Sequence, residues 1–354
     1  MRDLDPTRGR PVDPFGGFLS GQYYNEEATA YGGAMMTRAT DSVHSNRGYA
    51  LGNQRLQGVV TALASSGTTR QYFAQGIWRD NLVVYGGTGD YQLLTFPVTM
   101  QFYHIPSNTW STIAPCSLYP GKIRGCATEV VGDTMYMIGG YNPDRTTAHE
   151  TWKFNFLMKQ WTRLQDIPLP GSAGYFDYMA TSVVGNYIYV FSGYYKTGST
   201  QNYPNIIRFN ILSETWETLV STVGTTPGWF GALAINYNGQ IFLIGGKTPS
   251  GTVLNTNIVV PTSFADTTTV AKATMANTRQ YLFGFRFNDL IYVFGGAADS
   301  GEVYNIRCNR WAAHGISLPT YRFATKAHFY KGAMYFHAGS DGGTNVYQTT
   351  YRIE

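Results

Sequence analysis

The chain has 354 residues, of which 14% are charged and 43% are hydrophobic, and its formal net charge is +4. Its basic residues do not cluster and no segment has the length of a membrane span, so we expect no nucleic-acid partner and no membrane span. Heavy use of Tyr (27), Phe (20) and Gly (40) beside so little charge is typical of all-β proteins with wide contact surfaces.

Residues 1–54 form the first expected unit, an irregular N-terminal arm. This segment has no sustained period of 2 or 3.6 and no apolar stretch typical of a secretory signal, which favours synthesis in a cytoplasm. An arm of this kind is held either against its own chain or against another chain of a large assembly, and we expect the second. The apolar side chains available as anchors are Phe15, Phe18, Leu19, Tyr23, Tyr24, Met35 and Met36.

Residues 55–354 are dominated by one repeating pattern. Each copy has an apolar strand, a two-residue turn, a five-residue β-branched or aromatic run and a pair of small residues. The first members of successive pairs are 53, 53, 53, 50 and 43 residues apart. A period near fifty predicts an array of one supersecondary unit. The pairs are Gly86-Gly87, Gly139-Gly140, Ser192-Gly193, Gly245-Gly246, Gly295-Gly296 and Ala338-Gly339.

Two further strands follow each pair, which predicts four-stranded antiparallel blades and an all-β, six-bladed β-propeller. The third strand carries an aromatic residue in five copies. In four copies a tryptophan follows seven residues later, at Trp110, Trp161, Trp216 and Trp311. The fourth copy lacks both at Val259-Val260-Pro261, so we expect an irregular outer edge in that blade.

Closure of the ring is also predicted. The sixth copy reaches Glu354 directly after its third strand, whereas Val60-Thr-Ala-Leu63 has the register of the other fourth strands. We expect this N-terminal strand to complete the last blade and so remove the exposed edges of an open ring.

The small pair, the third-strand aromatic and the fourth-strand tryptophan resemble the kelch repeat, in its six-bladed propeller form, over about five-sixths of the chain. In that resemblance the glycines and tryptophans pack the blades together. No residue set predicts catalysis, a metal site or a cofactor, because the histidines lie on different blades without the spacing of metal ligands.

One set of positions is a candidate binding site. Counting back fifteen or sixteen positions from each pair reaches an arginine in four copies, at the start of the innermost strand, where long loops surround the channel mouth. Arginines at matching positions in kelch ubiquitin-ligase adaptors grip acidic peptides, so the resemblance implies an acidic peptide or a glycan as ligand. Alternatively, the arginines bond to loop carbonyl oxygens and brace the blades. The candidate residues are Arg70, Arg124, Arg279 and Arg322, with the loop aromatics Tyr141, Tyr194, Tyr195 and Trp229.

The function expected from these features is a non-enzymatic, structural or protein-interaction propeller held in a large assembly by residues 1–54. A bacteriophage virion component (tail, baseplate or decoration) made in the host cytoplasm fits best, and a cytoplasmic protein is the alternative. A carbohydrate- or receptor-binding propeller stays open as a second function. A sialic acid epimerase-type enzyme stays open as a third, with Glu129 or Asp177 in a pocket beside the arginines.

Overall fold

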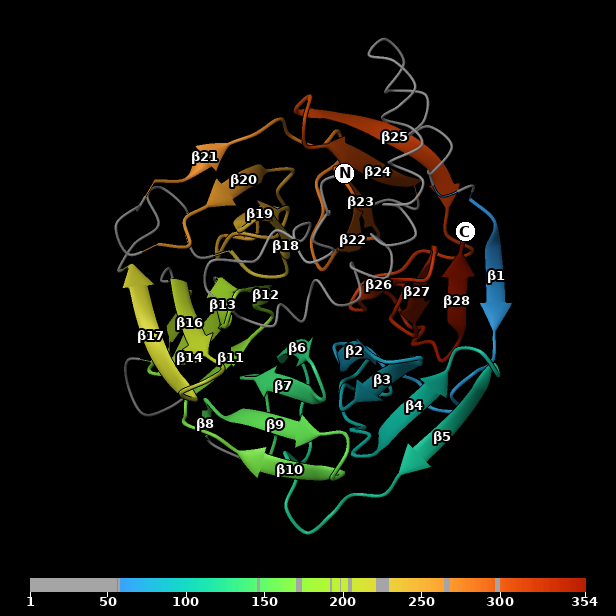
Figure 1. The fold of residues 1–354 in the computed structure, drawn as a ribbon, viewed down its shortest axis with the longest axis vertical. Helices are drawn as coiled ribbons and strands as arrows, with labels where there is room; N and C mark the ends of the chain where they lie inside the picture. Colours follow the sequence, from blue (N-terminus) through green and yellow to red (C-terminus); the bar gives the residue numbers. More distant parts are fainter. Residues whose placement is uncertain are drawn as a thin grey trace, which may run out of the picture.

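Six four-stranded antiparallel sheets stand around a central axis in the computed structural model (Figure 1). This arrangement confirms the predicted all-β, six-bladed propeller. The predicted arm, residues 1–54, lies outside the described part of the chain. The structure describes residues 56, 58–144, 147–169, 174–191, 193–197, 199–202, 206–220, 229–263, 268–296 and 300–354.

The first three blades follow one another along the chain, each running from the innermost to the outermost strand. Blade 1 contains β2 (Ala74–Trp78), β3 (Asn81–Tyr85), β4 (Met100–His104) and β5 (Thr109–Ile113). Blade 2 contains β6 (Ala127–Val131), β7 (Thr134–Ile138), β9 (Thr151–Asn155) and β10 (Gln160–Arg163). Blade 3 contains β12 (Ala180–Val184), β13 (Tyr187–Phe191), β16 (Ile206–Asn210) and β17 (Thr215–Val220).

The other three blades complete the ring. Blade 4 contains β18 (Leu233–Tyr237), β19 (Gln240–Ile244), β20 (Asn257–Val260) and β21 (Val270–Ala271). Blade 5 contains β22 (Phe283–Phe287), β23 (Leu290–Phe294), β24 (Ser300–Asn305) and β25 (Arg310–Ser317). Blade 6 contains β26 (Ala327–Tyr330), β27 (Ala333–His337), β28 (Thr350–Ile353) and β1 (Val60–Leu63).

Both ends of the repeat behave as predicted. β1 pairs antiparallel with β28, with Val60 opposite Ile353 and Ala62 opposite Tyr351, so an N-terminal strand closes the last blade (Figure 1). The outer strand of blade 4, β21, has only two residues. That blade therefore has the irregular outer edge expected from its missing aromatic and tryptophan.

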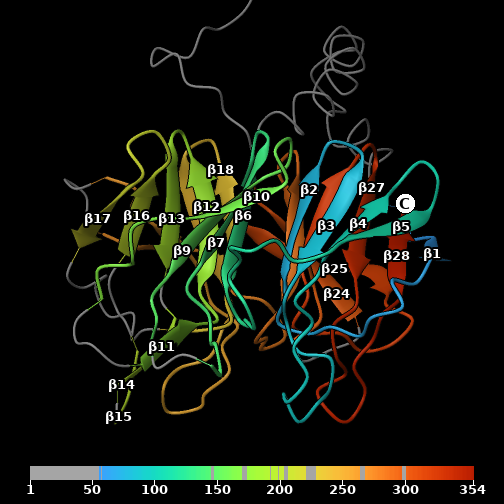
Figure 2. The same ribbon diagram turned by 90° about the horizontal axis from the view of Figure 1, so that it is seen from below.

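A seventh sheet lies outside the blades and was not predicted. It joins β15 (Ser199–Asn202), β14 (Tyr194–Thr197), β11 (Gly174–Asp177) and β8 (Thr147–Ala148), with β11 parallel to β8. Its strands come from the loops of blades 2 and 3, and Figure 2 shows β11, β14 and β15 at one end of the propeller. We call this end, which carries the loops between second and third strands, the loop face.

The small pairs bring the backbones of neighbouring blades into contact. The second residue of each pair donates its N–H to a carbonyl oxygen of the next blade, as in Gly87 to Ile123 and Gly246 to Arg279, both at 2.7 Å. The last of these bonds runs from Gly339 to Arg70 at 2.8 Å and joins blade 6 to blade 1. The first residue, at each described pair, has a positive φ, and a Cβ on Gly295 would lie 2.0 Å from the Arg322 oxygen. So close an approach requires glycine.

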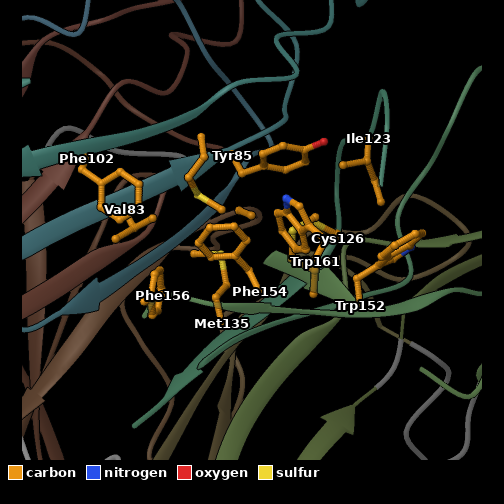
Figure 3. Close-up of a cluster of buried hydrophobic side chains, with 13 residues drawn as sticks. Val83, Tyr85, Phe102, Ile123, Cys126, Met135, Trp152, Phe154, Phe156 and Trp161 are labelled. Atoms are coloured by element: carbon orange, nitrogen blue, oxygen red, sulfur yellow. The ribbon is translucent and has the colours of Figure 1, made fainter. Parts of the chain in front are cut away.

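Buried side chains fill the space between adjacent blades. Figure 3 shows the cluster between blades 1 and 2, in which the ring centroids of Tyr85 and Trp161 are 5.0 Å apart. Three of the predicted tryptophans also donate their indole N–H to the outer edge of the preceding blade. Their acceptors are the carbonyl oxygens of Ala64 for Trp110, Gln165 for Trp216 and Ala273 for Trp311.

Candidate functional site

A closed ring of backbone hydrogen bonds surrounds the channel at the loop face. Its six members lie fourteen positions before the six small pairs, and each has a positive φ. Each donates its N–H to the carbonyl oxygen of the equivalent residue in the preceding blade, over 2.7 to 3.3 Å. The members are Tyr72, Gly125, Tyr178, Gly231, Tyr281 and Ala324.

Large and small residues alternate around this ring, and the tyrosines fill the axis. The ring centroids of Tyr72, Tyr178 and Tyr281 are 5.0 to 5.4 Å apart. The small members provide the room, since a Cβ on Gly231 would lie 2.8 Å from the Tyr281 ring. These three tyrosines, the tyrosine plug, close the channel at the loop face.

Three of the four candidate arginines lie inside their blades. Arg70, Arg279 and Arg322 are 0%, 0% and 1% exposed. Arg70 donates to the carbonyl oxygen of Gly86 and to the side chain of Gln101, and Arg279 donates to Gly295 and to the Glu302 carboxylate. Arg322 stacks on Tyr347, with 3.3 Å from its guanidinium carbon to the ring centroid. Their positions match the bracing alternative, and a role of these three in ligand binding stays a prediction.

Arg124 differs from the other three because it lies one position closer to its pair, and neighbouring residues of an extended chain point in opposite directions. Its side chain is 12% exposed, and its Nη1 lies 3.7 Å from Oδ2 of Asp177. The same guanidinium donates to the Tyr178 hydroxyl and lies 4.7 Å from the Tyr141 ring centroid. Burial raises the pKa of Asp177 well above its usual value, and the charge of Arg124 opposes that rise.

An unbroken series of aromatic contacts runs from Arg124 across the loop face. Tyr141 contacts Tyr175 at 5.1 Å between ring centroids, Tyr175 contacts Tyr194 at 5.8 Å, and Tyr194 contacts Phe230 at 5.4 Å. The three tyrosines are half-buried, and the seventh sheet positions two of them, since Tyr175 lies in β11 and Tyr194 in β14. We call Arg124, Tyr141, Tyr175, Tyr194 and Phe230 the mouth patch.

The remaining candidate aromatics lie elsewhere. Tyr195 and Trp229 are 2% and 6% exposed and belong to the cores between blades. Sequence reasoning missed Tyr175, Phe230 and the tyrosine plug. The plug lies fourteen positions before the small pairs and Phe230 fifteen, so comparing the copies at each of these positions separately would have found them. Tyr175 does not lie at a repeated position, so the repeat gives no signal for it.

A cavity of about 250 Å³ occupies the channel behind the tyrosine plug. Glu129 and Lys326 line it, and the Lys326 ammonium donates to the carbonyl oxygen of Thr128 over 2.8 Å. Burial raises the pKa of Glu129 and lowers that of Lys326, and each charge opposes the shift of the other. Burial and the nearby Lys326 lower the pKa of His328, also in the lining, to about 3.

Among the described residues, no group of three or more His, Cys, Asp or Glu side chains is placed to hold a metal ion. In the same part of the chain, no helix has the length and apolar character needed to cross a bilayer.

The repeats, their closure by β1 and the loop face define a kelch β-propeller, a class whose members are generally protein-interaction modules. The family model of the Attractin/LZTR1 β-propeller matches residues 28–264, more than half of the chain, and the chain belongs to this family.

Individual relatives are distant. Kelch domain-containing protein 3 of Homo sapiens is 25% identical over 251 residues, which cover 67% of this chain and 61% of the human protein. The Bos taurus protein of the same name is 26% identical over the same shares. Kelch-like protein terF of Aspergillus terreus is 25% identical over 152 residues, 41% of this chain and 31% of the fungal protein. The matched region thus spans about three-fifths of the mammalian relatives.

Proposed function

We propose that this chain is a non-enzymatic propeller that binds a partner protein through the mouth patch on its loop face. The observation that supports the proposal is the series of three half-buried tyrosines beside one arginine. Tyrosine and arginine are enriched where protein interfaces concentrate their binding energy, because they combine large apolar area with polar groups. The relatives, named as kelch proteins, support the same general role.

The ligand chemistry follows from how Arg124 is held. Asp177 already balances part of its charge, and the Tyr178 hydroxyl takes one of its donors. The patch therefore offers mainly aromatic surface with one partly shared cation. An extended peptide or loop with apolar and hydrogen-bonding side chains suits it better than a strongly acidic peptide.

The test removes two aromatic side chains from the patch and compares the result with a matched change elsewhere. Partners cross-linked to the wild-type chain in its native extract are identified by mass spectrometry, and the Tyr175→Ala, Tyr194→Ala double variant is assayed against them. We expect at least a 30-fold loss of affinity, equivalent to about 2 kcal/mol.

The control variant truncates the exposed Leu157 and Met158, in the turn between the third and fourth strands of blade 2. This control should keep full affinity. Equal binding by wild type and the mouth-patch variant, with both folded by circular dichroism, would refute the proposal.

We further propose that residues 1–54 attach the propeller to other chains of a large assembly, with a bacteriophage virion as the expected setting. The support is the series of apolar anchors in the sequence of the arm. The names of the mammalian and fungal relatives give no support for this setting. Deleting residues 1–54 should abolish incorporation into particles, and normal incorporation of the shortened chain would contradict the proposal.

A further inference from the structure

The central cavity carries polar and apolar side chains on different walls. Its volume of about 250 Å³ is just below the roughly 300–1,000 Å³ of sites for drug-sized ligands, so it suits a small molecule. Blades 2 and 6 supply a polar wall of Thr128, Glu129, Lys326 and His328. Blades 4 and 5 supply an apolar wall of Leu233, Ala234, Ile235, Leu282 and Phe283.

The polar wall holds two opposite charges. Glu129 lies on β6, whereas Lys326 directly precedes β26, and its ammonium reaches past the inner strand of blade 1 to Thr128, the residue before Glu129. The two groups interact electrostatically, yet no direct ion pair joins them within the described chain. A ligand placed between them therefore meets a negative and a positive group at once.

Each of these groups is only partly satisfied by the protein. Lys326 gives one hydrogen bond to Thr128, which leaves two of its three donors, and the Glu129 carboxylate accepts from the Thr181 hydroxyl. The buried His328 Nε2 has no hydrogen-bond partner among the described residues. Buried charged and polar groups with spare bonding capacity are costly unless something binds them.

We propose that the channel binds a free α-amino acid with an apolar side chain. Its carboxylate contacts Lys326, its ammonium contacts Glu129, and its side chain packs on Leu233 and Ile235 of the apolar wall. Because the tyrosine plug closes the loop face, the ligand enters from the opposite end of the ring. This site is separate from the mouth patch and does not depend on the protein-binding function proposed above.

The test is isothermal titration calorimetry of the full chain with three ligands. Leucine carries both charges, 4-methylpentanoate lacks the ammonium, and 3-methylbutylamine lacks the carboxylate. We expect saturable binding of leucine and at least tenfold weaker binding of each comparator. Glu129→Gln and Lys326→Met should each weaken leucine binding at least tenfold.

Two control variants separate this site from the rest of the molecule. Lys331→Met removes an exposed lysine that pairs with Asp80 outside the cavity, and it should bind leucine as the wild type does. The double variant Tyr175→Ala, Tyr194→Ala should also keep leucine binding, whatever it does to a partner protein.

Three results would overturn the proposal. They are no saturable binding of any apolar amino acid up to roughly 10 mM, equal binding of leucine and either comparator, and unchanged leucine affinity in both channel variants. If a channel variant does not fold by circular dichroism, the three ligands on wild-type protein decide the question alone.

Discussion

Mild acid should unfold this propeller, because three histidines are buried in their neutral form. Burial lowers the pKa of His314 to about 4, and it lowers those of His328 and His337 to about 3. The pKa of histidine in an unfolded chain is about 6.5. Because the folded pKa is lower than the unfolded one, stability is complete above pH 6.5 and is lost as the pH falls toward the folded pKa.

The size of the effect follows from these values. At pH 5 an unfolded histidine is protonated and a buried one is not, so each costs about 1.36 × 1.5, or roughly 2 kcal/mol, relative to neutral pH. Three such residues together cost about 6 kcal/mol, against a typical folding free energy of about 5–15 kcal/mol. Glu129 and Asp177 act in the opposite sense, because burial raises their folded pKa values.

Single variants isolate the histidine contribution from these carboxyl groups. Urea unfolding of wild type and of His337→Phe is measured between pH 6 and pH 4, where buried His337, with a folded pKa of about 3, contributes a slope of up to about 1.4 kcal/mol per pH unit. Phenylalanine keeps an aromatic ring between Phe73 and Trp110. The variant should lose the slope of one histidine, whatever its stability at neutral pH. A slope equal to that of wild type would refute the reasoning.

Two further predictions concern the contacts between and within blades. Gly295→Ala places a Cβ 2.0 Å from the Arg322 oxygen and should lower the free energy of unfolding by more than about 3 kcal/mol, measured in urea. The control Gly132→Ala, at a similar φ with no atom within 4 Å, should lower it by about 1 kcal/mol. Equal losses in the two variants would count against close backbone contact between neighbouring blades. Arg279→Met leaves the Glu302 carboxylate buried without a counter-ion and should cost about 3–5 kcal/mol, part of which Glu302→Gln restores. Strictly additive effects in this double-mutant cycle would show that the pair is not coupled.

The fold could be predicted because ring closure imposes a residue type at a fixed offset. Where one backbone approaches the next most closely, as at Gly295, a Cβ does not fit, and at the equivalent position of blade 6 only the small side chain of Ala338 is present. Each blade is therefore marked in the sequence by a pair of small residues. β1 could be placed because it shares the register of the other fourth strands. The seventh sheet left no such trace, since its strands lie in loops of unequal length, and β8 has only two residues.

The candidate site was predicted less well. Counting either fifteen or sixteen positions back from each small pair treats two neighbouring positions as equivalent, although their side chains point to opposite sides of an extended segment. Arg124 at the mouth was grouped with the buried Arg70 and Arg279, although its offset from the small pair is shorter than theirs by one position. Tyr194 and Tyr195 show the same effect, since the first lies on the loop face and the second in the core. The charges in the channel came from two blades far apart in the chain, and only the closed ring brings them together.

The alternation of tyrosine with glycine or alanine at the axis makes the pair of blades, not the single blade, the unit of this ring. A gene duplication that added one blade would place two tyrosines, or two small residues, next to each other. The first case would produce a steric clash at the axis, and the second would leave a gap there. Growth or shrinkage by two blades would keep the alternation intact. Attempts to build larger or smaller versions of this protein should therefore insert or remove neighbouring blades two at a time.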